Sequence, residues 1–252
     1  MATGVRIAAT RPDQPVALVT GAAGGLGQAL AKELDGLGCR VALHCNTSAG
    51  RAKELQENLK NESIVATADV GSWQEVSALF DRVADELGRV DVLVNNAAIR
   101  KDALMALQSP DDWWRVIETN LLGTFHTCRA AAPHMLRQRW GRIINIVSPS
   151  GLIATPGQTA YSASKAGVIG LTRTLAAECG RRGVTVNALS PGFMETAMTA
   201  GLPDRVKKGM MDKLPIPRFT TPEEVASSIA FFLESDYLTG QVISVDGGIS
   251  IS

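Results

Sequence analysis

Short apolar runs rich in β-branched residues alternate along the chain with patterns typical of amphipathic helices. The runs lie at Val16–Val19, Arg40–His44, Ile64–Ala68, Asp91–Val94, Arg142–Val147, Thr185–Leu189 and Gln241–Val245. The helical patterns cover about residues 25–38, 48–59, 72–87, 110–138, 158–179 and 222–234. Strands that alternate with helices form a mainly parallel sheet covered by helices on both faces. The alternation therefore predicts an α/β fold with a doubly wound sheet of about seven strands.

No linker, low-complexity tract or internal repeat divides the 252 residues. We therefore expect a flexible N-terminal tail over residues 1–14 and a single domain over residues 15–252. Lys plus Arg equals Asp plus Glu at 25 each, so the charge balance does not suggest a nucleic-acid partner. No apolar run approaches the about 18 residues that a membrane-spanning helix needs, and residues 1–14 lack the hydrophobic block of a secretory signal. We expect a cytoplasmic protein with no membrane partner.

The cysteines and histidines do not form a metal-binding pattern. Cys39, Cys45, Cys128 and Cys179 are scattered, with no C-x-x-C pair and no histidine at ligand spacing. Reduced thiols and no metal site are therefore expected.

Polar or turn-forming residues follow most of the predicted strands. They are Thr20-Gly21, Asp69, Asn95, Ser148 and Pro191-Gly192. The carboxyl ends of parallel strands meet at one edge of a doubly wound sheet, and ligands bind there near the switch in strand order. These residues are therefore expected to converge, although each taken alone is an ordinary turn or capping residue.

A glycine-rich turn, Gly21-x-x-x-Gly25-x-Gly27, joins the first strand to its helix. Glycines let the backbone approach a pyrophosphate, and a helix N-terminus supplies free N–H groups and a positive dipole. In this strand–turn–helix context the turn indicates a Rossmann-type nucleotide site. The spacing is not G-x-G-x-x-G, and such turns also occur as simple connections.

Tyr161 and Lys165 stand four residues apart in a helical pattern, so both lie on one face. A nearby ammonium favours the phenolate. Lowering a tyrosine pKa from roughly 10 to neutrality needs about 4 kcal/mol, more than one lysine supplies in a partly wet site. A second positive charge is therefore expected. Without other motifs, the pair fits equally a surface tyrosine packed on a lysine stem.

Six motifs in register resemble the short-chain dehydrogenase/reductase family over roughly residues 15–250. They are Thr20-Gly21-x-x-x-Gly25-x-Gly27, Asn95-Asn96-Ala97, Asn120, Ser148, Tyr161-x-x-x-Lys165 and Pro191-Gly192. Glu118-Thr119-Asn120, Gly141-Arg142-Ile143-Ile144 and Pro191-Gly192-Phe193-x-Glu195-Thr196 are most similar to the bacterial 3-oxoacyl-acyl-carrier-protein reductases and the related type II polyketide ketoreductases.

The resemblance implies a catalytic tetrad of Asn120, Ser148, Tyr161 and Lys165. In that role Tyr161 donates a proton to a ketone oxygen while a nicotinamide gives hydride to its carbon. Ser148 hydrogen-bonds the same oxygen, and Lys165 binds the nicotinamide ribose and lowers the pKa of Tyr161. The oxidised nicotinamide would be the second positive charge, and Asn120 would hold a water that passes protons to Lys165.

The cofactor site implied by the resemblance draws on the ends of five predicted strands and on the helix that carries Tyr161. Its expected residues are Gly21, Ala23, Gly24, Gly25, Leu26, Gly27, Asn46, Thr47, Ser48, Asp69, Val70, Asn96, Ala97, Ala98, Tyr161, Lys165, Pro191, Gly192, Met194 and Thr196. Three departures from the family pattern occur: Ala98 replaces a glycine, Pro149 follows Ser148, and the segment before Leu238 is about two residues short.

The end of the second strand favours NADP(H) over NAD(H). His44-Cys45-Asn46-Thr47-Ser48 offers no carboxylate to accept ribose hydroxyls, and Arg51 follows. Hydroxyl and amide groups at a helix start suit a 2′-phosphate. Against this, Gly24 stands where NADP-preferring relatives often carry Arg or Lys.

The expected activity is NADPH-dependent reduction of a β-keto acyl thioester linked to a carrier protein. Arg139 and Arg182 fall where carrier reductases place docking arginines, although either suits a solvated surface. One alternative is oxidoreduction of a free sugar, steroid or aryl ketone, with the methionine-rich stretch 194–213 lining the pocket. A non-catalytic Rossmann scaffold is the other.

The resemblance also implies a homotetramer built through helices 110–138 and 158–180 and the final strand. The apolar residues Leu121, Leu122, Phe125, Val168, Leu171 and Leu175 are compatible with it, as they are with packing inside one chain.

Overall fold

Seven parallel strands form one sheet in the order β3-β2-β1-β4-β5-β6-β7. The computed structural model describes residues 10–195 and 204–251. The strands are β1 (Val16–Val19), β2 (Arg40–Cys45), β3 (Ser63–Thr67), β4 (Val90–Asn95), β5 (Gly141–Ile146), β6 (Val184–Pro191) and β7 (Val242–Val245). The predicted doubly wound α/β fold is confirmed as a single domain, and each observed strand overlaps a predicted run.

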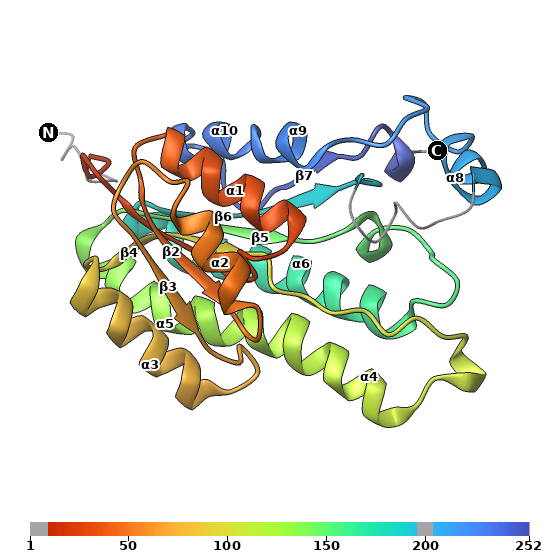
Figure 1. Cartoon of the computed structure of the whole chain (residues 1–252), viewed down its shortest axis with the longest axis horizontal. Coiled ribbons are helices and arrows are strands. Elements are labelled where there is room, and N and C mark those ends of the chain that lie inside the picture. The colour runs from red at the N-terminus through yellow and green to blue at the C-terminus, as the bar shows by residue number, and fades with distance from the viewer. Residues whose placement is uncertain (1–9, 196–203, 252) are drawn as a thin grey trace, which may run out of the picture.

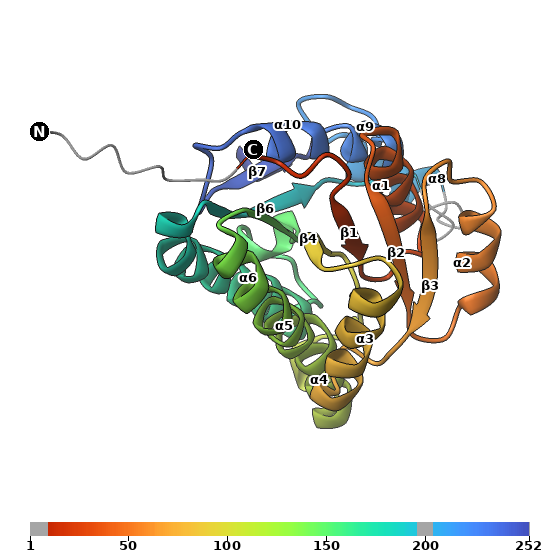
Figure 2. The ribbon, with the colours of Figure 1, turned by 90° about the vertical axis from the view of Figure 1, so that its left-hand side faces the viewer.

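Helices cover both faces of this sheet (Figure 1). One face carries α1 (Gly25–Gly36), α2 (Ala49–Gln56), α9 (Pro222–Ala226) and α10 (Ile229–Glu234), and the other carries α3 (Trp73–Glu86), α5 (Gly123–Gln138) and α6 (Thr159–Cys179). Figure 2 shows the two layers from the side on which the strands begin. Each layer has its own apolar core, because a strand buried on both faces sends alternate side chains to opposite sides. Leu30 and Phe232 pack in one core, and Val83 and Met135 in the other.

The switch in strand order lies between β1 and β4. From β1 the chain builds outward through β2 and β3, then crosses back to place β4 on the other side of β1. A crevice therefore opens where these two neighbouring strands end and their connections leave in opposite directions. This edge is the right-hand side of Figure 1, where α6 begins.

The predicted helix 110–138 is interrupted by a π-helical segment. It consists of α4 (Pro110–Ile117), the π-helical residues Glu118–Leu122, and α5. A π-helical turn holds one more residue than an α-helical turn, and such turns inside α-helices frequently occur at functional sites. Here the widened turn carries Asn120, whose side chain is buried.

The predicted helix 222–234 is two short helices, α9 and α10. Ser227 and Ser228 at the junction bond the backbone carbonyls of Glu224 and Val225 through their hydroxyls. Serine hydroxyls that donate hydrogen bonds to preceding carbonyls compete with the backbone hydrogen bonds of the helix. A helix also occurs where the sequence predicted loop, at α8 (Asp204–Met211).

The six apolar residues considered for a subunit interface divide into two groups. Val168 is buried in this chain's own core, with Leu121 packed on it, and Leu171 and Leu175 pack on the α3–α5–α6 core. Leu122 and Phe125 are exposed.

The N-terminal tail is described from Thr10 onward, and its predicted extent stays a prediction. Arg11 donates a hydrogen bond from Nη2 to the carbonyl of Leu37, 2.8 Å away. No helix in the described ranges is long and apolar enough to cross a membrane.

Candidate active site

Thr20 ties the ends of β1 and β4 together. Its hydroxyl oxygen accepts hydrogen bonds from the N–H groups of Asn96 and Ala97, at 2.9 and 3.0 Å. The Asn96 amide returns two bonds, to the carbonyls of Thr20 and Gly21, both at 3.0 Å. The glycine-rich turn and the Asn95-Asn96-Ala97 motif are thus one unit at the switch point, as their positions after strands predicted.

The turn is tight and depends on two glycines. Gly21 has φ 65°, a left-handed conformation that favours glycine. A Cβ on Gly27 would lie 2.2 Å from the carbonyl oxygen of Gly21. The first turn of α1 is therefore pressed against the loop that precedes it.

The N-terminus of α1 is open for an anion. Its N-cap is Gly24, which has no side chain to cap the helix, and the first turn carries no acidic residue. Gly24 and Gly25 are both exposed. Unpaired N–H groups and a positive helix dipole at such an end suit a pyrophosphate, so the residues present fit a dinucleotide.

Ser148 and Tyr161 are brought together across the sheet edge. Ser148 lies just beyond β5, and Tyr161 is in the first turn of α6. The Ser148 hydroxyl lies near enough to the Tyr161 phenol to lower its pKa by hydrogen bonding. The structure therefore brings these two residues together.

Lys165 lies one helical turn after Tyr161 and is almost fully buried. Its ammonium donates to the carbonyl of Ile146 at 2.7 Å and lies 5.6 Å from the centroid of the Tyr161 ring. Burial lowers the pKa of Lys165 to about 8 because the ammonium has lost water. Gly151 explains the close fit, since a Cβ there would lie 3.0 Å from Lys165.

Burial raises the pKa of Tyr161 in the protein alone, against the lowering expected from Lys165. The Arg100 guanidinium and the Ser148 hydrogen bond oppose this effect, and Asp102 adds to it. Lys165 is not among the groups that shift the pKa of Tyr161 here. Arg100, which the sequence did not single out, is the cation with a resolved influence on Tyr161, and the nicotinamide expected as the second positive charge stays a prediction.

The side-chain amide of Asn120 forms hydrogen bonds with Ile99 and Ser164. Its Oδ1 accepts from Ile99 N–H at 2.8 Å, and its Nδ2 donates to the Ile99 carbonyl at 3.0 Å and to Ser164 Oγ at 3.1 Å. Ser164 in turn donates to the carbonyl of Tyr161 at 2.7 Å. Asn120 therefore links the β4 loop to the helix that carries Tyr161 and Lys165.

A polar chain that the sequence reading missed runs from Ser148 to the rim of the site. Ser150 donates its N–H to Ser148 Oγ at 3.2 Å and its hydroxyl to Gln158 Oε1 at 2.9 Å. Gln158 donates from Nε2 to Asp102 at 3.1 Å, and Asp102 lies 3.9 Å from Arg100. These residues come from two separate loops, after β4 and after β5, so no local motif could reveal them.

The remaining strand ends also lie where they were expected. Asp69 follows β3, accepts the N–H of Gly71 at 2.8 Å, and so orders the loop that contains Val70. Gly192 follows β6, and a Cβ there would lie 2.5 Å from Asp246, so only glycine fits. Thr196 lies outside the described residues.

The end of β2 presents no carboxylate. Asn46 and Thr47 are exposed, and Ser48 is the N-cap of α2 without using its side chain for capping. Neither an acidic side chain nor a side-chain cap occupies the start of α2. A phosphate would meet no repulsion from that helix end.

Comparison with known proteins agrees with this geometry. A family profile described as Enoyl-(Acyl carrier protein) reductase matches residues 21–250. The 3-oxoacyl-acyl-carrier-protein reductase FabG of Staphylococcus epidermidis is 44% identical over 239 residues, covering 92% of this chain and 98% of that protein. Nodulation protein G of a Rhizobium species is 44% identical over 237 residues, covering 93% and 96%. FabG of Thermotoga maritima is 40% identical over 250 residues, covering 96% and 100%.

The chain belongs to the short-chain dehydrogenase/reductase family. It is an NAD(P)-dependent oxidoreductase of that family, and the predicted resemblance is confirmed.

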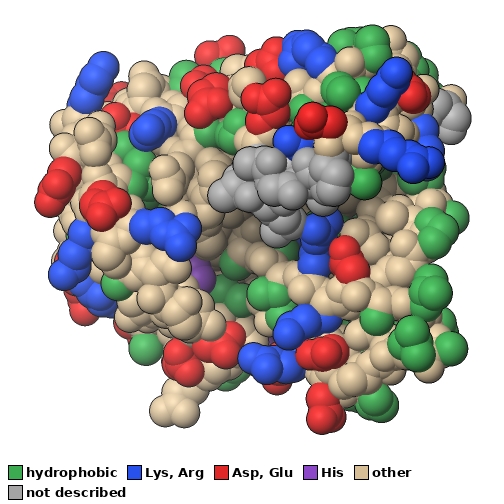
Figure 3. All heavy atoms as spheres, turned by 45° about the vertical axis from the view of Figure 1, so that its right-hand side comes forward, with side chains coloured by type: hydrophobic (Ala, Val, Ile, Leu, Met, Phe, Trp, Pro, Cys, Tyr) green, Lys and Arg blue, Asp and Glu red, His purple; other side chains and the backbone are tan. Residues whose placement is uncertain are grey.

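The face of the molecule that Figure 3 shows is hollowed. Figure 3 shows the face on which the strands end, with Lys and Arg side chains along the rim of the hollow and apolar side chains gathered to one side.

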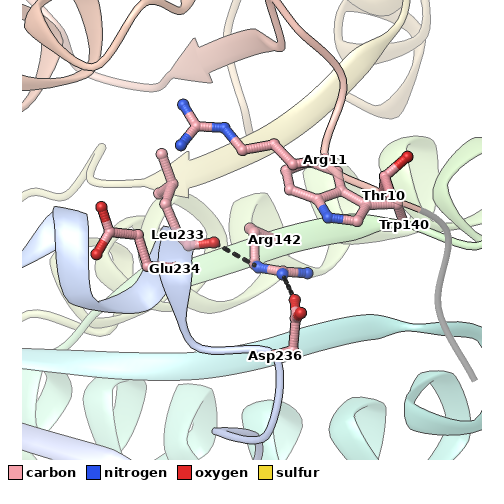
Figure 4. A pocket seen from close by; sticks show the side chains of 7 residues that line it. All are labelled: Thr10, Arg11, Trp140, Arg142, Leu233, Glu234 and Asp236. Atoms are coloured by element: carbon pink, nitrogen blue, oxygen red, sulfur yellow. Dashed lines mark hydrogen bonds and ion pairs between the residues drawn. The ribbon is translucent and has the colours of Figure 1, made fainter.

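A separate cavity of about 420 Å³ lies at the opposite edge, lined by residues that include Trp140, Arg142 and Asp236 (Figure 4). There the buried Arg142 bonds the Leu233 carbonyl at 3.2 Å and pairs with Asp236. Arg142 is committed to protein groups, so we read this cavity as structural.

The two arginines expected to dock a carrier do not flank the mouth of the same chain's site. Arg139 ends α5 just before β5 begins, and Arg182 lies between α6 and the start of β6. The 18 residues of α6 between Tyr161 and Cys179 span about 27 Å at 1.5 Å per residue. Both arginines thus sit at the opposite edge of the sheet, because helices in parallel folds return the chain to the starting edge.

The four cysteines are free and buried. Burial raises the pKa of Cys128 to about 12 and that of Cys39 to about 11, which keeps both thiols protonated. Within residues 10–195 and 204–251, no group of three or more His, Cys, Asp or Glu side chains could hold a metal ion.

Proposed function

We propose that this chain uses NADPH to reduce the 3-oxo group of an acyl thioester, carried on an acyl carrier protein, to the 3-hydroxyacyl product. The neighbouring side chains of Tyr161 and Ser148, with the Lys165 ammonium 5.6 Å from the centroid of the Tyr161 ring, are the observation that supports carbonyl reduction most directly. The substrate class is supported by the FabG relatives, which match over more than nine-tenths of the chain.

Tyr161 is the general acid of this proposal. Burial keeps its pKa above the ordinary value, so the hydroxyl holds its proton at neutral pH and can give it to a ketone oxygen. Bound NADPH supplies the hydride that reaches the carbonyl carbon. One hydride and one proton together convert the ketone to the alcohol.

Ser148 orients the same carbonyl. Its hydroxyl lies beside the phenol, so a ketone oxygen placed between them receives two hydrogen bonds, which stabilise the charge that develops there. The 3₁₀ turn Pro149–Gly151 and the Ser150 N–H hold Ser148 in place.

Lys165 and Asn120 support the proton donor. Lys165 has a pKa of about 8, so it holds a proton near neutrality and favours the phenolate left after transfer. Every described hydrogen bond of the Asn120 side chain goes to Ile99 or Ser164. A water bound near Asn120 would therefore rely on its backbone rather than on its amide.

The lack of a carboxylate at the end of β2 and in the first turn of α2 supports NADP(H) as the cofactor. The open start of α1 would hold the pyrophosphate, Asp69 and Val70 would border the adenine, and Pro191, Gly192 and Met194 would border the nicotinamide. Asn46, Thr47, Ser48 and the exposed Arg51 would face the 2′-phosphate.

The test is an NADPH-oxidation screen. Acyl-carrier-protein and coenzyme A 3-oxoacyl thioesters are compared with simple ketones, each with NADPH and NADH. We expect the highest kcat/KM with the carrier-linked thioester and NADPH. A higher kcat/KM with a sugar, steroid or aryl ketone would replace the proposal by the free-ketone alternative, and no turnover with any substrate would favour the non-catalytic scaffold.

The assembly we propose is a cytoplasmic homotetramer. Exposed Leu122 and Phe125 on the π-helical segment and α5, and the partly exposed edge strand β7, support contacts through these elements. Light scattering measures the assembly directly, and a monomer at micromolar concentration would contradict it.

A further inference from the structure

His44 is a buried histidine whose ring joins two loops of the crevice. It lies near the end of β2 with a side chain that is 1% exposed. The N–H of Gly21 donates to its Nδ1 at 3.3 Å, and its Nε2 lies 2.9 Å from the carbonyl of Ala68. Its own carbonyl accepts the N–H of Ala22 at 2.8 Å. One residue thus contacts both the glycine-rich turn and the residue before Asp69.

The partners assign the protonation state of this ring. A backbone carbonyl only accepts, so Nε2 carries the hydrogen, and a backbone N–H only donates, so Nδ1 carries none. A second proton would set Nδ1–H against Gly21 N–H and place a charge in a buried position. Burial lowers the pKa of His44, although the bond to Ala68 and the Asp69 carboxylate oppose this.

The charged groups around the ring are few. Asp69 faces it from the β3 end, and Glu75 reaches the same loop from α3 by accepting the Asp69 N–H at 2.8 Å. Cys45 is the neighbour on β2, and burial raises its pKa, so it stays uncharged. The glycine-rich turn, residues 20–27, has no ionisable side chain. Asp69 is therefore the one charge with a resolved influence on His44.

The position of Gly21 determines the position of the start of α1, because the glycine-rich turn is tightly packed. Gly27 cannot move toward Gly21, since even a Cβ would come within 2.2 Å of the Gly21 carbonyl. A displacement of Gly21 therefore shifts the start of α1, where the proposed pyrophosphate site lies. On the other side, Ala68 leads into the Asp69–Val70 loop expected beside the adenine.

We propose that His44 is a positioning residue of the dinucleotide site: its neutral imidazole fixes the distance between the glycine-rich turn and the Asp69–Val70 loop, and its protonation weakens cofactor binding. This inference rests on the proposed cofactor site. It concerns binding, whereas proton transfer to the substrate belongs to Tyr161.

The first experiment measures the Kd of NADPH between pH 5 and 8 for the wild type, His44→Gln and His44→Leu. Gln keeps one donor and one acceptor but does not titrate, and Leu keeps neither. For the wild type we expect Kd to rise about twofold more toward pH 5 than for His44→Gln, because a ring that is neutral at pH 6 is only partly protonated there. The full tenfold that a pKa difference of one unit between free and bound protein implies is reached only below both pKa values. For His44→Leu, Kd should be raised throughout.

Controls separate this effect from other titrations. The 2′-phosphate of NADPH titrates in the same range, but it does so equally in the wild type and in His44→Gln. His134→Gln makes the same chemical change on α5, where His134 contacts only Gln138 among its described hydrogen bonds, and should follow the wild type. Identical pH dependence in the wild type and His44→Gln would overturn the proposal.

A second measurement uses the cofactor-free protein. Nitrogen-15 histidine NMR, assigned with His44→Gln, should show His44 as the Nε2–H tautomer and neutral at pH 6. An Nδ1–H tautomer, or protonation at an ordinary pH, would overturn the proposal and leave the proposed function standing. Absence of NADPH binding at pH 8 with the expected tautomer present would instead overturn the proposed function. If His44→Leu fails to fold, His44→Gln and the NMR measurement still decide.

Discussion

The Lys165 ammonium lies 2.7 Å from the Ile146 carbonyl, which anchors it to the end of β5. The residue two places after Ile146 is Ser148, so one short stretch of β5 positions both partners of Tyr161. The ammonium bonds the sheet at 2.7 Å and lies 5.6 Å from the centroid of the Tyr161 ring. A charge fixed in place by the backbone is the arrangement that efficient electrostatic catalysis requires.

Removing the Tyr161 hydroxyl should abolish reduction and spare cofactor binding. In Tyr161→Phe the ring and its packing remain, but the proton donor is lost, so we expect kcat to fall by about 10³-fold, within the range of general acid catalysis. NADPH binding, followed by fluorescence titration, should stay within about twofold, a change worth less than 1 kcal/mol. Turnover that survives this substitution would mean that another group donates the proton.

The reduction rate should be constant near neutral pH and should fall only at alkaline pH. Tyr161 has a raised pKa and Lys165 one of about 8, so both are protonated below pH 7 and Lys165 loses its proton first as pH rises. With saturating NADPH, kcat/KM for a free 3-oxoacyl thioester should be constant from pH 6 to 7 and decline with a midpoint near pH 8. A decline centred near pH 6 would contradict this assignment.

Replacing Lys165 with methionine should stabilise the fold while inactivating the enzyme. The pKa falls from 10.5 to about 8 on folding, so the folded state binds fewer protons between those values and stability rises with pH across that window. At pH 7 the full penalty is present. Allowing for the lost Ile146 bond, Lys165→Met should raise the free energy of unfolding by about 1–2 kcal/mol. Denaturant unfolding at pH 7 and pH 10 measures this, and the gain should shrink at pH 10.

The exposed Lys32 on α1 provides the matched control. Lys32→Met is the same substitution at a lysine whose charge is solvated, so it should change the free energy of unfolding by no more than about 0.5 kcal/mol at both pH values. Equal stabilisation in the two variants would show that burial of Lys165 is not the cause.

Gln158 should act on turnover through Ser148. In Gln158→Met the bonds to Ser150 and Asp102 are lost, so the loop that orients Ser148 loosens. We expect kcat to fall about tenfold, an effect typical of small misplacements, with the KM for NADPH unchanged. Gln241→Met, a change at an exposed position before β7, should leave kcat unchanged. A rise in the KM for NADPH in Gln158→Met would assign the residue to the cofactor instead.

Charge reversal at Arg139 or Arg182 should affect only the carrier-linked substrate. A carrier protein is acidic, so losing a docking cation should raise its KM by about fivefold, near 1 kcal/mol, and spare a free ketone. Both residues lie at the edge opposite Tyr161 of their own chain, so the effect requires another subunit's site nearby. Lys53→Glu on α2 is the control, and equal effects on both substrates would count against docking.

Local patterns in the sequence predicted much of the fold and the centre of the site. The strand runs, the glycine-rich turn and the Tyr161–Lys165 spacing each depend on neighbours within a few residues. Position after a strand also predicted that Ser148 and the segment beginning at Asn95 belong to the sheet edge, because parallel topology brings strand ends together.

The tertiary structure decided what depends on packing between distant segments. Strand order, the π-helical turn at Asn120, the Gln158 chain and the two bonds of His44 join residues that no short pattern relates. Burial also differs from one expectation: it raises the pKa of Tyr161, because the phenolate loses water, where Lys165 was expected to lower it. Periodicity and turn chemistry are local properties that a sequence carries directly. Desolvation and the partners of a buried polar group exist only once the chain has closed around them.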